Sequence, residues 1–371
     1  MSIQLNTIKH HSTASYILDL LRFISAFVVF LYHFHFNLPG YQAVMVFFVL
    51  SGYFISTSVI KSIKEGTWSW KIYLIKRCVR LWIVLIPALV LTYVWAIIQV
   101  HFFGSTPLFY GVLNIKTLLG NLLFTQDILV KQYGLNGPLW SLTYEFWYYI
   151  LFPCALLIFY SKRRKTKLFY FIGVMGIGLF VGKQIMLYFV IWLLGALIAI
   201  VKPFAFKKSS VNYFVLFILM AVAGASTKGL YTFYDAQTSW MNPYFVPDLS
   251  VGIAFALLIY WVINLFGAEN SNGQLFISKE LAGFSYTLYL VHYPLLYFWN
   301  AWTSSPYWHI DDKHTLGVKI IFFAAIIVYA YILAKVTEFK TAKVTSMIFN
   351  ILKKYNFLRV PKGSKRLETL N

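Results

Sequence analysis

The sequence predicts an all-α polytopic membrane protein, a bundle of about ten transmembrane helices with both termini in the cytoplasm. Of its 371 residues, 60% are hydrophobic and only 12% are charged, which is about half the charge of an ordinary soluble domain. The apolar residues gather in runs long enough to cross a bilayer. The basic residues gather in alternate loops between these runs. Together these observations exclude a soluble fold and a soluble domain with a single anchor.

Runs of about 17–25 apolar residues mark the expected spans. The first run lacks the small-residue cleavage site of a signal peptide, so we expect it to remain as the first span. The segment 105–130 contains Pro107, Gly111 and Gly120 and is expected to be amphipathic or re-entrant, which leaves a total of ten or eleven helices. The ten runs lie near 16–36, 42–60, 79–100, 138–160, 168–182, 184–201, 211–228, 249–266, 281–301 and 316–337.

The distribution of basic residues predicts the orientation of the spans. An even number of spans places both termini on one side, and the positive-inside rule identifies that side. One set of loops, together with the C-terminal tail, carries 24 lysines and arginines, whereas the other set carries five. We therefore expect residues 1–338 to form one transmembrane domain and residues 339–371 a basic cytoplasmic tail. The net charge of +20 then reflects topology and attraction to membrane lipid, and no nucleic-acid partner is expected.

Arg22 and His33 lie in the same first run of apolar residues. Ionisable residues inside a membrane span are costly and are by default functional candidates. Eleven residues at about 100° each make roughly three turns, so the two side chains share one helix face about 16 Å apart. Such a face suits a long substrate with a charged head and a reactive tail. Taken alone, Arg22 also fits a snorkelling residue, and His33 an interhelical hydrogen bond.

Glu145 is the only acidic residue in the run 138–160, and a buried carboxylate needs a partner or a proton. Its expected depth is within about one turn of that of His33. We therefore expect a carboxylate–imidazole pair, the arrangement that orients a general base. In the second span, Gly52 permits close approach of helix backbones, and Ser51 is expected to hydrogen-bond near the site. Packing alone also explains that segment.

Arg77 and Arg80 are neighbours on one helix face at the expected cytoplasmic end of the third span. Two guanidinium groups there would hold a phosphate, although an ordinary positive-inside cluster also explains them. In the ninth span, Tyr289, His292 and Tyr293 share a face and are expected to line a polar cavity. The alternative is an aromatic packing face. Trp140, at the start of the fourth span, is placed in the same substrate-binding set.

These residues belong to five motifs whose order resembles that of the membrane acyltransferase family 3. Each motif alone is weak, but five in the same order, spread from Tyr16 to Leu333, are specific. They are Arg22 followed after ten residues by His33, the FFxLSG segment at Phe47–Tyr53, the RxxR element at Arg77–Arg80, the PLWSLxxE element at Pro138–Glu145, and the SYxxYLxHxPL element at Ser285–Leu295.

The resemblance implies an integral enzyme of the bacterial cytoplasmic (inner) membrane that transfers an acyl group to a hydroxyl of a glycan or glycolipid. The donor is usually acetyl-CoA, which acts as a co-substrate, and no permanently bound cofactor is expected. His33 aligns with the essential histidine of the family, and Arg22, Arg77 and Arg80 align with arginines assigned to acyl-donor binding. Cys78 and Cys154 lack metal-ligand spacing, so no metal is expected.

Two questions stay open from the sequence. His33 would either deprotonate the acceptor hydroxyl or carry the acyl group covalently. The alternative function is a membrane carrier of a glycolipid or small solute, because ionisable residues near the middle of spans are also a carrier signature. Against a carrier, the sequence contains no recognisable inverted repeat and no matching pair of Gly/Pro-broken helices.

Overall fold

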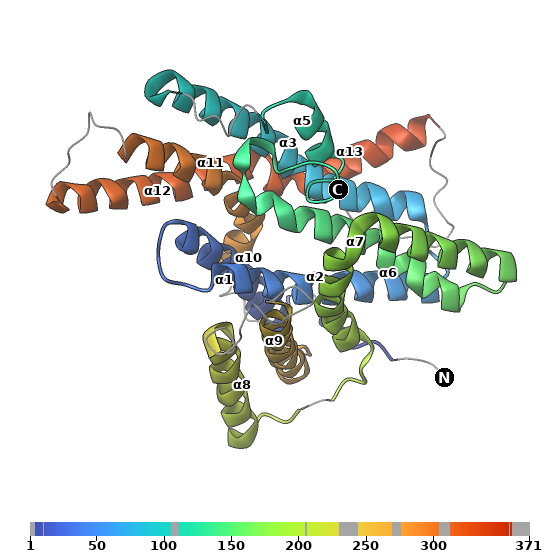
Figure 1. The fold of residues 1–371 in the computed structure, drawn as a ribbon. Helices are drawn as coiled ribbons and strands as arrows, with labels where there is room; N and C mark the ends of the chain where they lie inside the picture. Colours follow the sequence, from blue (N-terminus) through green and yellow to red (C-terminus); the bar gives the residue numbers. More distant parts are fainter. Residues whose placement is uncertain are drawn as a thin grey trace. The chain divides into compact units, whose positions relative to one another are not determined.

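The computed structural model of the protein describes residues 4–9, 11–104, 111–204, 206–229, 244–268, 276–303, 312–355 and 357. Throughout these residues the regular structure is helical (Figure 1). An isolated bridge joins Gln126 and Val130. Eight of the described helices are long and apolar enough to cross a membrane. The predicted all-α membrane fold is therefore confirmed.

The difference between eight helices and ten predicted runs has a structural explanation. The runs 168–182 and 184–201 are both contained in α7 (Arg164–Ile200), where Gly182, at φ +80°, interrupts the helical backbone. The run 281–301 corresponds to α11 (Ser285–Thr303), which is less apolar because it carries histidine, tyrosine and asparagine side chains. In the segment 105–130, residues 105–110 lie outside the described residues, and α5 (Ile115–Leu122) has only eight residues, too few to span a bilayer. The span number and the cytoplasmic termini remain predictions.

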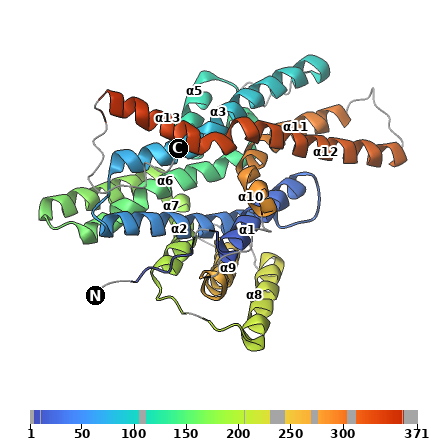
Figure 2. The ribbon, with the colours of Figure 1, turned by 180° about the vertical axis from the view of Figure 1, so that it is seen from behind.

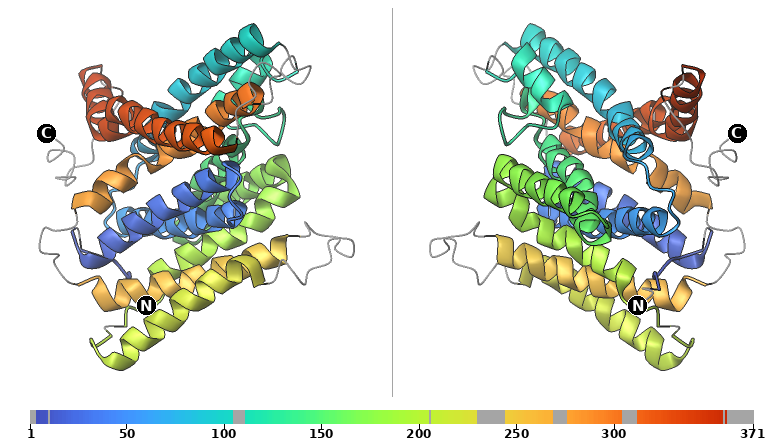
Figure 3. Two further views of the ribbon diagram at one scale, coloured as in Figure 1. Left: turned by 90° about the vertical axis from the view of Figure 1, so that its left-hand side faces the viewer. Right: turned by 90° about the vertical axis from the view of Figure 1, so that its right-hand side faces the viewer.

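The chain forms two compact units, of which unit 1 comprises residues 1–32, 36–66 and 144–282. Within it, α2 packs against α7 and α9, and α8 runs alongside α9 (Figure 3). Its elements are α1 (Thr13–His33) up to Tyr32, α2 (Gly40–Lys64), most of α6 (Trp140–Tyr160), α7, α8 (Ser210–Gly229), α9 (Phe245–Phe266) and α10 (Phe276–Gly283) up to Ala282.

Two glycines allow α2 and α7 to pack closely in unit 1. A Cβ atom at Gly52 would overlap the carbonyl oxygen of Trp192, and a Cβ atom at Gly195 would overlap the carbonyl oxygen of Val49. Both obstacles are backbone atoms, which cannot move aside as the end of a side chain can. Small residues at helix crossings permit this backbone approach in membrane proteins. The expectation for Gly52 is therefore confirmed.

Unit 2 comprises residues 33–35, 67–143 and 283–371. Within it, α11 packs against α3 and α12, and α13 packs against α3 (Figure 2). The segment expected to be a basic tail thus begins with a helix that is attached to α3. The elements of unit 2 are α3 (Trp70–Phe103), α5, η1 (Tyr133–Leu135), η2 (Gly137–Leu139), the first residues of α6, α11, α12 (Asp312–Val336), η5 (Glu338–Lys340) and α13 (Thr341–Lys354).

The long helix α3 changes character along its length. Its first turns carry four basic side chains between Lys71 and Arg80. Beyond them, large apolar side chains are exposed along one face at helical spacing. A continuous exposed apolar stripe suits contact with lipid rather than water. The stripe consists of Trp82, Ile86, Val90, Tyr93 and Ile97.

We expect Gly195→Ala to lower stability by about 1–3 kcal/mol, because the added methyl group has no space against the backbone of α2. The midpoint of thermal unfolding of the detergent-solubilised protein measures this loss. Gly176→Ala is the matched control, since this glycine also lies in α7 but has no atom within 4 Å of a Cβ, and alanine is the better helix former. Equal losses in both variants would contradict the close crossing of α2 and α7.

Candidate active site

His33 is the last residue of α1 and contacts α11 within unit 2. Its Nδ1 atom lies 2.9 Å from Nε2 of His292, and the two rings are stacked with centroids 5.1 Å apart. The ring of Tyr293 stands edge-on to His33 at 4.8 Å. Two histidines that the sequence singled out separately, in the first and ninth predicted spans, therefore meet in one site.

The hydrogen bonds of this histidine pair determine which nitrogen atoms carry protons. Nδ1 of His292 lies 2.8 Å from the carbonyl oxygen of Leu288, one turn earlier in α11. Because a carbonyl oxygen only accepts, Nδ1 of His292 donates, and Nε2 of the neutral ring accepts. The proton between the two rings therefore belongs to Nδ1 of His33. In this tautomer Nε2 is the basic nitrogen of His33.

Pro294 and Asn136 attach the loop before α6 to the helix that carries His292. Pro294 has no N–H group, so the carbonyl oxygen of Leu290 loses its helical donor. The side-chain amide of Asn136 donates to that oxygen at 3.0 Å and also to Oγ1 of Thr92, on α3, at 3.2 Å. Asn136 is fully buried. The loop is thereby held to both α3 and α11.

The beginning of α6 contacts the same part of α11. Oγ of Ser141 lies 2.8 Å from the hydroxyl of Tyr289. Gly137 lies so near Tyr293 that a Cβ atom there would be 3.4 Å from the end of the tyrosine ring. Trp140, half-buried, is the first residue of α6. The structure thus places Trp140, Tyr289 and Tyr293, like His292, in unit 2 on adjoining segments. It adds Ser141, for which the sequence predicted no role.

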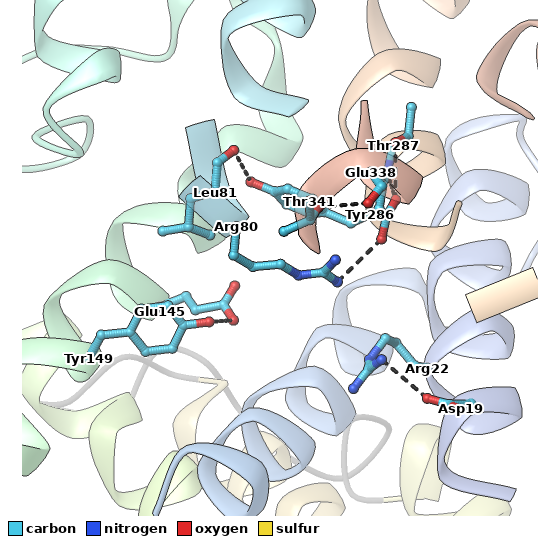
Figure 4. A network of polar contacts seen from close by, with 10 residues as sticks. All are labelled: Asp19, Arg22, Arg80, Leu81, Glu145, Tyr149, Tyr286, Thr287, Glu338 and Thr341. Atoms are coloured by element: carbon cyan, nitrogen blue, oxygen red, sulfur yellow. Dashed lines mark hydrogen bonds and ion pairs between the residues drawn. The ribbon is translucent and has the colours of Figure 1, made fainter. Parts of the chain in front are cut away.

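Glu145 has other partners than the imidazole expected from the sequence. Its Oε1 atom accepts a hydrogen bond from Oγ of Ser51 at 3.2 Å. The same atom accepts one from the hydroxyl of Tyr149 (Figure 4). Two hydroxyl groups of unit 1 therefore donate to one oxygen of this carboxylate, and the imidazole bonded to His33 is that of His292. The pairing of Glu145 with the imidazole of His33, which lies in unit 2, stays a prediction. Ser51 thus forms a hydrogen bond, and its position near the site stays a prediction.

Two of the three predicted arginines have partners close to them in sequence. Arg22 forms an ion pair with Asp19 at 3.3 Å (Figure 4) and lies over the ring of Phe54 at 5.4 Å from its centroid. These contacts are within unit 1. In unit 2, the guanidinium of Arg77 lies 5.4 Å from the ring centroid of Tyr73, one turn earlier in α3. Both arginines are only partly exposed.

Arg80 is held by a buried carboxylate that the sequence did not identify. Its Nη2 atom lies 3.2 Å from Oε1 of Glu338 (Figure 4), whose side chain is only 1% exposed. The other oxygen of Glu338 accepts from the backbone N–H of Thr287 at 2.9 Å and from its hydroxyl at 3.0 Å. A buried charge that loses its partner is strongly destabilising. Glu338 therefore restricts where the Arg80 guanidinium can point.

Asp248 was also not singled out from the sequence, and its buried carboxylate lies in the first turn of α9. The hydroxyl of Tyr188 donates to it at 2.5 Å, and the hydroxyl of Tyr41 donates to that of Tyr188 at 3.2 Å. All three residues belong to unit 1. Asp248 and Glu338 each lie at the edge of an apolar run in the sequence. An acidic residue at such a position can be either solvated or buried, so the position marks it as a candidate only.

The described residues do not contain a recognisable metal centre. No group of three or more His, Cys, Asp or Glu side chains among them is placed to hold an ion. Cys78 and Cys154 are not joined in a disulfide. The described part of unit 2 contains the His33–His292 pair and also Arg77 and Arg80.

Comparison with known proteins gives a family. A model described as an acyltransferase domain, that of acyltransferase family 3, matches residues 15–336. Peptidoglycan O-acetyltransferase OatA of Listeria monocytogenes is 31% identical over 178 residues, which are 44% of this chain and 27% of that protein. An uncharacterized protein of Haemophilus influenzae is 30% identical over 139 residues, which are 34% of this chain and 54% of that protein. No solved structure gives a significant match.

The matched regions thus span between about a quarter and about half of the length of these two relatives. The family model, in contrast, covers most of the chain and contains His33, Arg80, Glu145 and His292. With its apolar helices, the protein is a multi-pass membrane protein that belongs to acyltransferase family 3.

Proposed function

We propose that the protein is an integral membrane O-acyltransferase. It moves an acyl group, in the first instance acetyl, from cytoplasmic acyl-CoA to a hydroxyl of a cell-surface polysaccharide or glycolipid precursor at the bacterial inner membrane. The observation that carries the proposal is the chain of hydrogen bonds from His33 through His292 to the carbonyl oxygen of Leu288. Family membership and the similarity to a peptidoglycan O-acetyltransferase support the reaction class.

His33 acts as the general base in this proposal. The acceptor hydroxyl gives its proton to Nε2 of His33 while its oxygen attacks the thioester carbonyl carbon. The carbon–sulfur bond breaks, and the departing CoA thiolate takes the proton back from the imidazolium. Nδ1–H of His33 stays bonded to His292, and that hydrogen bond strengthens when the ring is charged. The C-terminal end of α1 also favours a positive charge at His33.

Arg77 and Arg80 bind the phosphates of the donor in this proposal, since CoA is a polyanion. A guanidinium has five N–H donors, so Arg80 can bond to Glu338 through Nη2 and to a phosphate through its remaining N–H groups. Arg22, Ser51 and Glu145 keep their predicted roles in donor binding and catalysis. The carrier alternative makes a different prediction, because a carrier leaves the thioester intact.

Replacing His33 by alanine is expected to lower the rate of acyl transfer about 10²–10⁴-fold, the usual contribution of a general base. The measurement is release of CoA from radiolabelled acetyl-CoA by the purified protein when a saccharide acceptor is added. Monodispersity in detergent controls for folding. A wild-type protein that releases no CoA, or a His33→Ala variant of normal rate, would overturn the proposal. Label that stays on the protein without acceptor would replace direct transfer by an acyl-histidine intermediate.

His292→Phe is expected to reduce kcat by about 10- to 150-fold, the cost of losing one hydrogen bond to a group that becomes charged. His292→Gln, whose amide oxygen can still accept from Nδ1 of His33, should recover part of that loss. The KM values of both substrates should change little, because the ring acts through His33. The assignment fails if Gln and Phe are equally impaired, or if the loss lies in KM alone.

Arg77→Gln is expected to raise the KM for acyl-CoA about tenfold or more, by loss of a charge-assisted hydrogen bond, and to leave the acceptor KM unchanged. A single substitution of Arg80 would leave the buried carboxylate of Glu338 without its ion-pair partner, which is destabilising. The double variant Arg80→Gln/Glu338→Gln avoids this and should show the same donor-selective increase. An equal rise of both KM values would argue against a donor clamp.

A further inference from the structure

Helix α13 is attached to α3 by one of its faces (Figure 2). On that face Phe349 is 4% exposed and Thr345, one turn earlier, is 7% exposed. Nζ of Lys76 lies 5.9 Å from the ring centroid of Phe349. Just before the helix, Glu338 forms its ion pair with Arg80. Contacts near both ends of the segment thus set the rotation of α13 about its own axis.

The opposite face of α13 is exposed and combines apolar with basic side chains. Met347 is 62% exposed and Ile351 is 45% exposed, and Lys343 and Lys354, both exposed, lie on the same face at helical spacing. No acidic residue occurs from 339 to 355. We call these four residues the outer face of α13. Apolar side chains flanked by lysines are typical of helices that lie in the plane of a membrane surface.

The attachment points place α13 at a defined level along α3. Lys76 and Arg80, which contact the segment, belong to the basic first turns of α3. The exposed apolar stripe of α3 begins directly after them, at Trp82. If that stripe contacts hydrocarbon, the basic turns lie at the level of the lipid headgroups. Helix α13 is then held at the boundary between headgroups and acyl chains.

We infer that the outer face of α13 docks on the surface of a bilayer that contains anionic phospholipid. Met347 and Ile351 enter the acyl boundary, and Lys343 and Lys354 bind lipid phosphates. Charge complementarity identifies this occupant, because a face with lysines and no acids on a chain of net charge +20 repels a second copy of itself. The inference is independent of the proposed acyl transfer.

Nitroxide labels on the full-length protein in lipid nanodiscs test the inference. Single cysteines replace Met347, Ile351 or Lys353 after Cys78 and Cys154 have been changed to alanine. Lys353 is exposed but lies about 200° around the helix from Ile351, so it reports the other side. In discs with phosphatidylglycerol, the labels at 347 and 351 should be more accessible to oxygen, relative to a water-soluble nickel reagent, than the label at 353.

Charge variants separate anionic lipid from other occupants. In the Lys343→Gln/Lys354→Gln double variant, or in discs of phosphatidylcholine alone, the contrast between 351 and 353 should diminish. The matched control Lys162→Gln/Lys167→Gln removes two exposed lysines elsewhere and should leave the contrast intact. Three results would overturn the inference. The labels at 347 and 351 could be as accessible to the nickel reagent as a label in water, or they could be inaccessible to both reagents, as under a protein partner. The third is a difference in accessibility between 351 and 353 that does not depend on the charge of the lipid.

Discussion

A polar group inside a membrane-spanning fold must find its hydrogen-bond partners within the protein, because hydrocarbon offers none. This constraint explains the histidine pair, in which His292 needs both the carbonyl oxygen of Leu288 and the N–H of His33. It also explains the buried carboxylate of Glu338, which is satisfied by Arg80 and Thr287. Reactive groups are therefore held in fixed orientations by partners on other helices, which is the preorganisation that catalysis requires.

The same constraint explains why the sequence predicted the fold class and much of the site. Ionisable residues are conspicuous against a background that is 60% hydrophobic, so His33, His292 and Glu145 could each be singled out. Span positions follow from local composition, which needs no knowledge of tertiary contacts. Local composition also separated the predicted runs 168–182 and 184–201, and Gly182 does interrupt the helix between them.

The pairing of these residues could not be predicted, because it depends on which helices meet. Depth alone suggested Glu145 as the partner of His33, but depth does not reveal the hydrogen bonds that Ser51 and Tyr149 donate to Glu145 in unit 1. Asp248 and Glu338 were not identified because each stands at the end of an apolar run. Only the fold shows that the hydroxyl of Tyr188 donates to Asp248 and that Arg80 forms an ion pair with Glu338.

The proline in α11 has a mechanical consequence for access to His33. Pro294 has no N–H group to donate to the carbonyl oxygen of Leu290, and the side chain of Asn136 donates to it instead. If Asn136 moved away, this buried oxygen would have no hydrogen-bond donor, which is costly in free energy. The loop before α6 is therefore a stationary element and a poor choice for a lid. Segments whose backbone groups are satisfied internally can move at lower cost, because their movement exposes no bare carbonyl.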